Sequence, residues 1–145
     1  MRRSRIGLLT AGAALTALVL AGCASSPLSN DSFKETIPAA LDSSDLGITS
    51  SWADKGLDGF STHISVGATF DRADISAADL QALIGIVVNE NTVDARYLQL
   101  AIEDPDGEDI DIVPLLEQLG AAPLESAFVR ISYDEARSIA SQDDQ

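Results

Sequence analysis

An alternation of apolar and polar residues over positions 60–70 constrains the fold of this chain more than any other feature. Phe60, Thr62, Ile64, Val66, Ala68 and Phe70 alternate with Ser61, His63, Ser65, Gly67 and Thr69. Because successive side chains of a strand point to opposite faces of a sheet, a period of two predicts a strand with one buried face and one face in water. The sequence therefore requires helices to cover the apolar face, and it leaves the polar face to solvent or to a partner.

The residues before this strand predict its hairpin partner. Ile48, Ser50 and Trp52 fall on one face of a strand, and residues 55–59, Lys-Gly-Leu-Asp-Gly, have the composition of a turn. Trp52 is in phase with Ile48, so we expect it in the core. The two strands are predicted to form an antiparallel hairpin.

Helix signals surround this hairpin. Ser32 and Glu35 have the spacing of a capping box for a first helix that ends by Gly47. Pro38 leaves two alternatives open, a helix that starts nearer Thr36 or a kinked helix. Residues 76–79 have the same cap spacing at a second helix, and its apolar stripe contains Leu80, Leu83, Ile84 and Val87.

The second half of the chain continues the alternation of strands and helices. Residues 93–102 predict a strand that runs parallel to residues 60–70 after a right-handed crossover. Asp111 is a candidate N-cap of a third helix that ends at Gly120, residues 126–131 predict a fourth strand, and Ser132 with Glu135 caps a last helix ending near Ala140. The order αββαβαβα predicts an α+β two-layer sandwich, in which a three- to four-stranded sheet packs on helices.

The first residues predict an export signal. Arg2, Arg3 and Arg5 precede residues 6–20, which carry no charge and are mostly Leu, Ala, Val and Gly. A helix of residues 6–20 reaches roughly 22 Å, which is short of the roughly 30 Å hydrocarbon core of a bilayer. A cleaved leader is therefore favoured over a permanent membrane span.

The end of this leader reads Leu20-Ala21-Gly22-Cys23 and contains the only cysteine of the chain. It resembles the lipobox of bacterial lipoproteins. The resemblance implies that the Cys23 sulfur receives a diacylglyceryl group, that the chain is cut before Cys23, and that further acylation with a fatty acid such as palmitate follows. The alternative is an ordinary signal peptide in which the cysteine is incidental.

These patterns predict the domain organisation. Residues 1–22 are the signal peptide, 23–31 the lipidated cysteine and a flexible tether, 32–140 a single α+β domain, and 141–145 a disordered tail. Two acyl chains anchor a protein stably, whereas one does not. The predicted location is the cell membrane, by a lipid anchor on its extracytoplasmic face. The domain resembles small α+β lipoproteins of unknown function from actinobacteria.

Charge limits the partners. The formal charge of the chain is −14, and loss of residues 1–22 removes three arginines and no acidic residue, which makes the charge −17. No basic patch exists to neutralise phosphates, so nucleic acid is excluded. Repulsion also disfavours lying flat on an anionic membrane. Lipidation of Cys23 leaves no free thiol, so disulfides and thiol catalysis are excluded.

Two groups are candidates for chemistry. His63 is the only histidine, and one histidine does not make a multi-histidine zinc site. Residues 103–111 are rich in carboxylates, and Asp104, Asp106 and Glu108 offer the hard oxygen ligands that calcium prefers, although their spacing is not that of an EF-hand loop. The corresponding ordinary interpretations are an exposed strand residue and a solvated turn.

No catalytic motif and no cofactor-binding motif occur in the sequence. We therefore expect a membrane-anchored exported lipoprotein with a small, acidic, non-catalytic binding or interaction domain, with an envelope protein as a further partner and no cofactor. The alternatives are a divalent-cation-binding lipoprotein and a small carboxylate-based hydrolase of the cell envelope.

Overall fold

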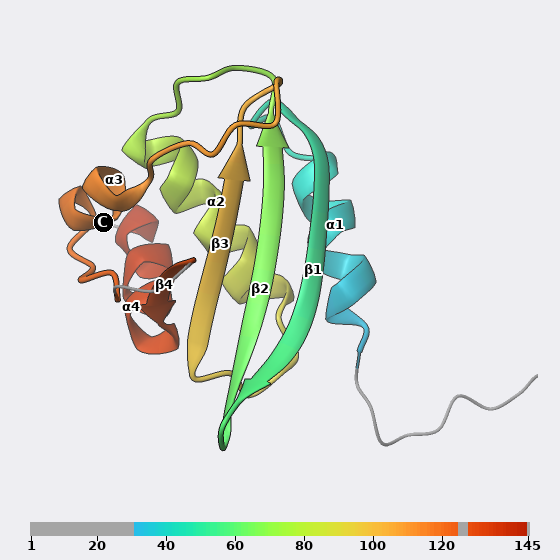
Figure 1. Ribbon diagram of the computed structural model, residues 1–145, viewed down its shortest axis with the longest axis vertical. Coiled ribbons are helices and arrows are strands. Elements are labelled where there is room, and N and C mark those ends of the chain that lie inside the picture. The colour runs from blue at the N-terminus through green and yellow to red at the C-terminus, as the bar shows by residue number, and fades with distance from the viewer. Residues whose placement is uncertain (1–30, 125–127, 145) are drawn as a thin grey trace, which may run out of the picture.

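The computed structural model describes residues 31–124 and 128–144, and it confirms the α+β fold. Its elements in chain order are α1 (Phe33–Asp42), β1 (Ile48–Asp58), β2 (Ser61–Phe70), α2 (Ala77–Glu90), β3 (Tyr97–Glu103), α3 (Val113–Gln118), β4 (Val129–Ser132), α4 (Tyr133–Ala140) and the 3₁₀ helix η1 (Ser141–Asp144). The strands form one sheet in the order β1-β2-β3-β4 (Figure 1). The predicted leader, Cys23 and most of the tether lie outside the described residues.

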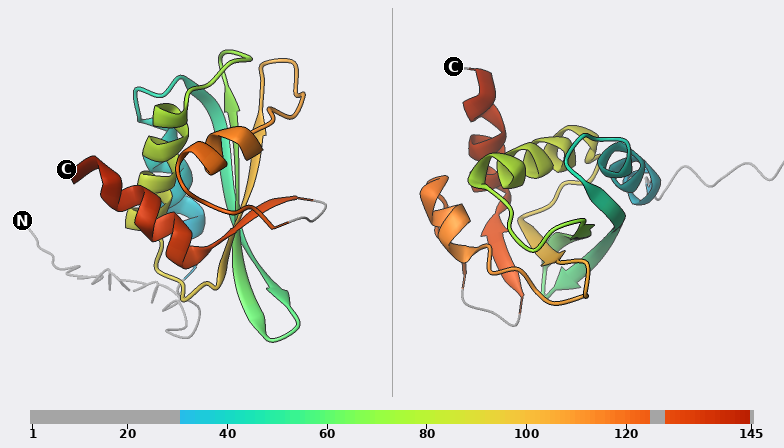
Figure 2. Two further views of the ribbon diagram at one scale, coloured as in Figure 1. Left: turned by 90° about the vertical axis from the view of Figure 1, so that its left-hand side faces the viewer. Right: turned by 90° about the horizontal axis from the view of Figure 1, so that it is seen from above.

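The sheet is mixed. β1 and β2 form an antiparallel hairpin, β2 and β3 are parallel, and β3 and β4 are antiparallel. The parallel return of β3 after the crossover helix α2 is as predicted. Figure 2 shows α1, α2 and α4 on one face of the sheet, while none of the described helices covers the other face. We call this second face the open face.

The core lies between the sheet and the helices. Strand β2 contributes Ile64, Val66 and Phe70, and β3 contributes Leu98, Leu100 and Ile102. The helices contribute Phe33, Ile37, Leu41, Leu80, Leu83, Ile84, Val87, Leu116, Tyr133, Ala136 and Ile139. Burial of one such large side chain stabilises the fold by about 1.5–3 kcal/mol, so this interface between the two layers determines the fold.

Two of the three predicted capping boxes are present. Ser76 caps α2 with Asp79, and Ser132 caps α4 with Glu135, each through reciprocal hydrogen bonds between side chain and backbone. The backbone hydrogen bond from Ser76 is the main reason why the pKa of Asp79 is lowered. The hydrogen bond with the Ser132 side chain likewise lowers the pKa of Glu135.

The remaining helix starts differ from prediction. The side chain of Ser32 does not cap α1, which begins at Phe33 and contains Pro38 in its interior. The N-cap of α3 is Ile112 rather than Asp111, although a carboxylate oxygen of Asp111 accepts a hydrogen bond from the Val113 amide at 3.1 Å. The Asp111 side chain thus accepts from an amide of the first turn of α3 although Asp111 lies one residue before the N-cap.

The hairpin corrects three sequence predictions. A register shift between Ile48 and Ser50 changes the phase of β1, so Trp52 pairs with Gly67 on the open face and is not in the core. The predicted turn at 55–59 is wrong, because β1 continues to Asp58 and the turn is Gly59-Phe60. Gly59 has a φ of 62°, as the first residue of a two-residue hairpin turn requires. Phe60, predicted to be buried, therefore lies in the turn.

The C-terminus is more ordered than the predicted tail at 141–145. Residues 141–144 form η1, and the Gln142 side-chain amide donates a hydrogen bond to the Leu119 carbonyl at 3.2 Å. This contact joins the end of the chain to the segment that follows α3. Within the residues that the structure describes, no helix combines the length and the hydropathy needed to cross a membrane.

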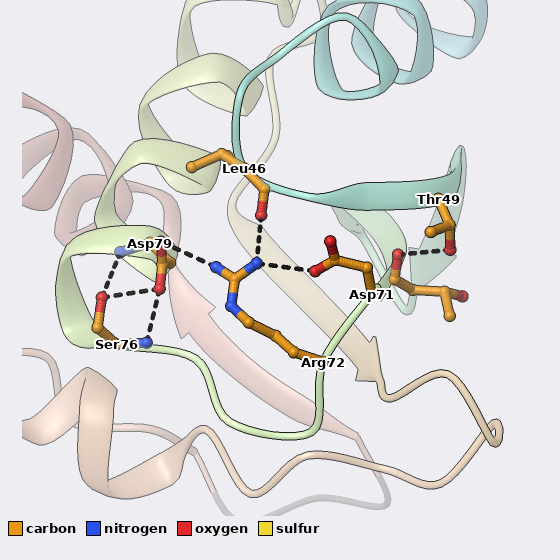
Figure 3. Close-up of polar contacts among 7 residues, drawn as sticks. Leu46, Thr49, Asp71, Arg72, Ser76 and Asp79 are labelled. Carbon is orange, nitrogen blue, oxygen red and sulfur yellow. Dashed lines mark hydrogen bonds and ion pairs between the residues drawn. The ribbon is translucent and has the colours of Figure 1, made fainter.

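Arg72 holds the end of the sheet at which β2 finishes (Figure 3). Its Nη1 donates to the Leu46 carbonyl at 2.8 Å and to Asp71 at 3.0 Å, and its Nη2 pairs with Asp79 at 3.1 Å. Its guanidinium also lies over the Phe70 ring, 5.2 Å from the centroid. One side chain thus joins the α1–β1 loop, the end of β2 and the first turn of α2.

Candidate functional site

The open face is the part of the sheet left without a helix, and cross-strand register assigns its residues. Ser61, His63, Ser65, Gly67 and Thr69 of β2 project onto it, as the alternation predicted. Gly67 has Trp52 and Ala101 as its neighbours on β1 and β3. Ser65 has Gln99 beside it, and Gln99 pairs in turn with Arg130 of β4. The face therefore consists of an apolar region and a polar region.

The apolar region is a groove of about 250 Å³. Trp52 and Phe128, which are 51% and 61% exposed, line it together with Ala101 and the backbone between them. The indole of Trp52 lies directly over Gly67, since a Cβ atom at position 67 would overlap with its Nε1 and Cε2 atoms. A glycine is needed at 67 for the indole to lie flat on the sheet. We call the hollow between Trp52 and Phe128 the aromatic groove.

The polar region is organised by Arg130. Its Nη1 donates to a carboxylate oxygen of Asp58 at 2.9 Å, so β4 is linked to the far end of β1. Its guanidinium also lies over the Tyr97 ring, 5.4 Å from the centroid. The Arg130 side chain is only 16% exposed. An arginine held by an ion pair and an aromatic ring at this depth has one fixed position.

Gln99 connects Arg130 to β2. With its amide oxygen toward Arg130, Gln99 accepts hydrogen bonds from Nη2 at 2.6 Å and from Nε at 3.2 Å, and its amide nitrogen donates to Ser65 at 2.7 Å and to Nε2 of His63 at 3.2 Å. This orientation is assigned because it gives both ends of the amide complementary partners. Gln99 is the one buried polar side chain among the described residues. We call Asp58, Arg130, Gln99, Ser65 and His63 the polar network.

His63 occupies the end of this network. Its ring lies over Gly56, where a Cβ atom would overlap with Nε2. Nε2 accepts the hydrogen bond from Gln99, so a neutral His63 carries its hydrogen on Nδ1. Nδ1 is buried and has no hydrogen-bond partner within the described residues. No carboxylate contacts the ring in this part of the chain, so His63 lacks the orienting group that a catalytic triad supplies.

The acidic loop lies elsewhere, beyond the end of β3. One carboxylate oxygen of Asp104 accepts hydrogen bonds from the amides of Asp106 and Glu108, both at 2.9 Å. Gly107 has a φ of 81° in the turn between them. Asp104 thus closes its own loop, and among the described residues no group of three or more His, Cys, Asp or Glu side chains is placed to hold a metal.

The sequence predicted which β2 residues lie on the open face, but not the residues that the other strands contribute to it. It did not single out Gln99, Arg130 and Phe128, because strand pairing brings them to β2 from distant parts of the chain. Gly56 and Gly67 were the available signal, since each lies opposite a large ring across the hairpin. No protein-family model, no curated protein and no solved structure matches this chain.

Proposed function

We propose that the protein is a lipid-anchored interaction module on the extracytoplasmic face of the cell membrane, and that its open face binds an apolar segment of another envelope protein. The lipobox-like residues 20–23 support the anchor. The aromatic groove supports the binding role, and it is the observation on which that role rests. A non-catalytic module agrees with a site in which Arg130, Gln99 and Ser65 are bonded within the polar network.

The groove has the composition of a protein-binding surface. Tryptophan and other large aromatic residues are enriched at binding hot spots, where they give a large contact area at low entropic cost. Trp52 and Phe128 are two of the five large apolar side chains that are exposed among the described residues, and both line the same hollow. The partner residue that fits such a hollow is apolar.

The polar network gives this surface its rigidity. Arg130 and Gln99 join β2, β3 and β4 on the same face, directly beside the groove. A surface held in one conformation loses less entropy when a partner binds. The network therefore acts as a frame for the groove, in which Arg130 uses three of its five N–H donors on Asp58 and Gln99.

A photo-cross-linking experiment tests the binding role. A photoreactive phenylalanine replaces Phe128 in the groove, and in a second strain it replaces Ser138, which is exposed on α4. We expect a cross-linked product in the envelope from position 128 and none from position 138. Equal products from both positions would contradict a specific surface.

Two matched glycine variants make this test sharper. Gly67→Ala places a Cβ atom where the indole lies and displaces it, whereas Gly85→Ala adds a Cβ in open space on α2. The first variant should abolish the cross-link and the second should keep it. Because the chain has a single tryptophan, the emission of Trp52 reports the displacement directly. A cross-link that persists after Trp52 is displaced would show that the groove is not the docking surface.

A further inference from the structure

We infer that the tip of the β1–β2 hairpin, Leu57 to Phe60, is a second membrane contact that inserts into the lipid surface holding the anchor. This inference rests on the lipid anchor of the proposed function and concerns a different part of the molecule from the aromatic groove. Three observations carry it: the exposure of the tip, the place where the described chain begins, and the distribution of charge.

The tip presents large apolar side chains to solvent. Phe60 is fully exposed and Leu57 is 76% exposed. Leu57 lies just before the turn and Phe60 lies in it, at the end of a hairpin that extends past the neighbouring loops in Figure 1. Aromatic and leucine side chains at a projecting point are suited to the boundary between lipid head groups and acyl chains.

The tether places this tip next to the bilayer. Asp31, the first described residue, forms an ion pair with Lys55 at 2.8 Å, and Lys34 pairs with Asp54 at 2.6 Å. The start of the domain is therefore held against the hairpin end of β1. Eight peptide steps separate Cys23 from Asp31, and they span at most roughly 28 Å. A lipid on Cys23 thus keeps Asp31, and with it the hairpin end of β1, within roughly 28 Å of the lipid head groups.

The distribution of charge also favours contact through the tip. Residues 71–79 and 103–111 contain nine acidic residues and one arginine, and they follow the ends of β2 and β3 that lie away from the tip. β2 spans ten residues, so this acidic end lies roughly 30 Å from the tip, several times the screening length of about 8 Å at physiological salt. Repulsion from anionic lipid is therefore weak when the tip points at the membrane.

The basic residues gather at the opposite end. Residues 23–145 contain six, and only Arg72 lies at the acidic end of the sheet. Arg96 and Arg137 line one hollow with Phe60, and Asp94 and Asp134 line the same hollow. Arg130 pairs with Asp58 beside the turn. Acidic side chains near the tip are thus balanced by basic ones, so this end repels anionic lipid less than the acidic end does. The overall charge disfavours lying flat on a membrane, but it permits contact through this end.

The test uses the natural lipidated protein in vesicles of phosphatidylcholine and phosphatidylglycerol. When Cys23 is lipidated, Ser61→Cys introduces a single free thiol beside the tip. A nitroxide attached to this thiol reports its depth in the bilayer, through how often it collides with oxygen compared with a water-soluble nickel complex. Asp106→Cys provides the same label at the acidic end. We expect the label at 61 to be shielded from nickel and the label at 106 to be fully accessible to it.

Replacing the tip should remove the shielding. Leu57→Ser with Phe60→Ser, in the Ser61→Cys background, should return nickel accessibility to that of position 106. Leu124→Ser changes another exposed apolar residue and should leave the shielding intact. If the protein binds vesicles but its label at 61 is accessible to nickel, the insertion is overturned and the anchor is not. If the label is shielded in native membranes but not in vesicles, the insertion is also overturned, because the tip then contacts a protein. Protein that does not bind vesicles would overturn the anchor and the insertion together.

Discussion

The two ends of β2 differ in the side chains that they leave exposed to solvent. At the Phe70 end, Arg72 joins three segments (Figure 3). Gly47 leaves room for it, since a Cβ atom there would lie 2.6 Å from Nη1. At the Ser61 end, Arg130 links the end of β1 to β4 through Asp58, but the hairpin tip itself exposes Leu57 and Phe60. The first end uses polar contacts for stability, whereas the second leaves apolar surface that contributes little to folding. This difference agrees with the membrane contact that we infer for the tip.

The largest effect that we expect comes from Cys23, the residue that we propose carries the lipid anchor. Cys23→Ser removes the sulfur that would carry the lipid, so the protein should be lost from the membrane fraction or remain as an uncleaved precursor. Fractionation and immunoblotting measure this. Full retention of a correctly processed Cys23→Ser chain would contradict the anchor.

The next largest effect concerns the Arg72 junction. Arg72→Met should lower the free energy of unfolding by about 1–2 kcal/mol, because a backbone carbonyl and two carboxylates lose a charged donor that is itself partly exposed. Urea denaturation measures the change. Arg137→Met is the control, since Arg137 pairs with the highly exposed Asp134 and should change stability by less than about 0.5 kcal/mol. Equal losses in both variants would show that the junction has no special role.

A smaller effect should appear in acid. The pKa of Asp79 is lowered in the fold, chiefly by the backbone hydrogen bond from Ser76. The pKa of an aspartate in the unfolded chain is about 3.9, so the unfolded chain takes up protons at a higher pH than the folded one. The stability that Asp79 contributes is therefore present above about pH 3.9, and it is lost as the pH falls through the lower pKa of the folded state. Between pH values of roughly 4 and 2, Asp79→Asn should therefore lose stability less steeply than the natural protein. If stability falls with pH equally steeply in Asp79→Asn and in the natural protein, the role of Asp79 is contradicted.

The smallest effect should come from the tip. Leu57→Ser with Phe60→Ser should change the free energy of unfolding by less than about 0.5 kcal/mol, because neither side chain is buried. Thermal melting of the soluble domain measures it. A loss as large as that of Arg72→Met would mean that the tip supports the fold, and the contrast between the two ends would fail.

The sequence predicted the layers better than the surface. Strict alternation in β2 and the caps at Ser76 and Ser132 depend on local spacing, so they could be read directly. Trp52 could not, because a shift of register between Ile48 and Ser50 reverses the face of everything that follows in β1. No periodicity reveals such a bulge from one strand alone.

The polar network shows a second limit. Arg130 reaches Gln99 and Asp58 from a strand that begins far along the chain, and pairing between distant strands is not encoded by local spacing. His63 was correctly placed on the polar face, but its contact with Gln99 depends on the parallel return of β3. Residues 20–23 and 24–30 lie outside the described residues, so the anchor and the tether stay predictions.

Intact mass spectrometry of the protein extracted from membranes tests the anchor most directly. We expect a chain that begins at Cys23 and carries the added mass of a diacylglyceryl group on that residue. A chain that begins elsewhere, or one with an unmodified Cys23 thiol recovered from the soluble fraction, would contradict the lipid anchor and the orientation that we derive from it.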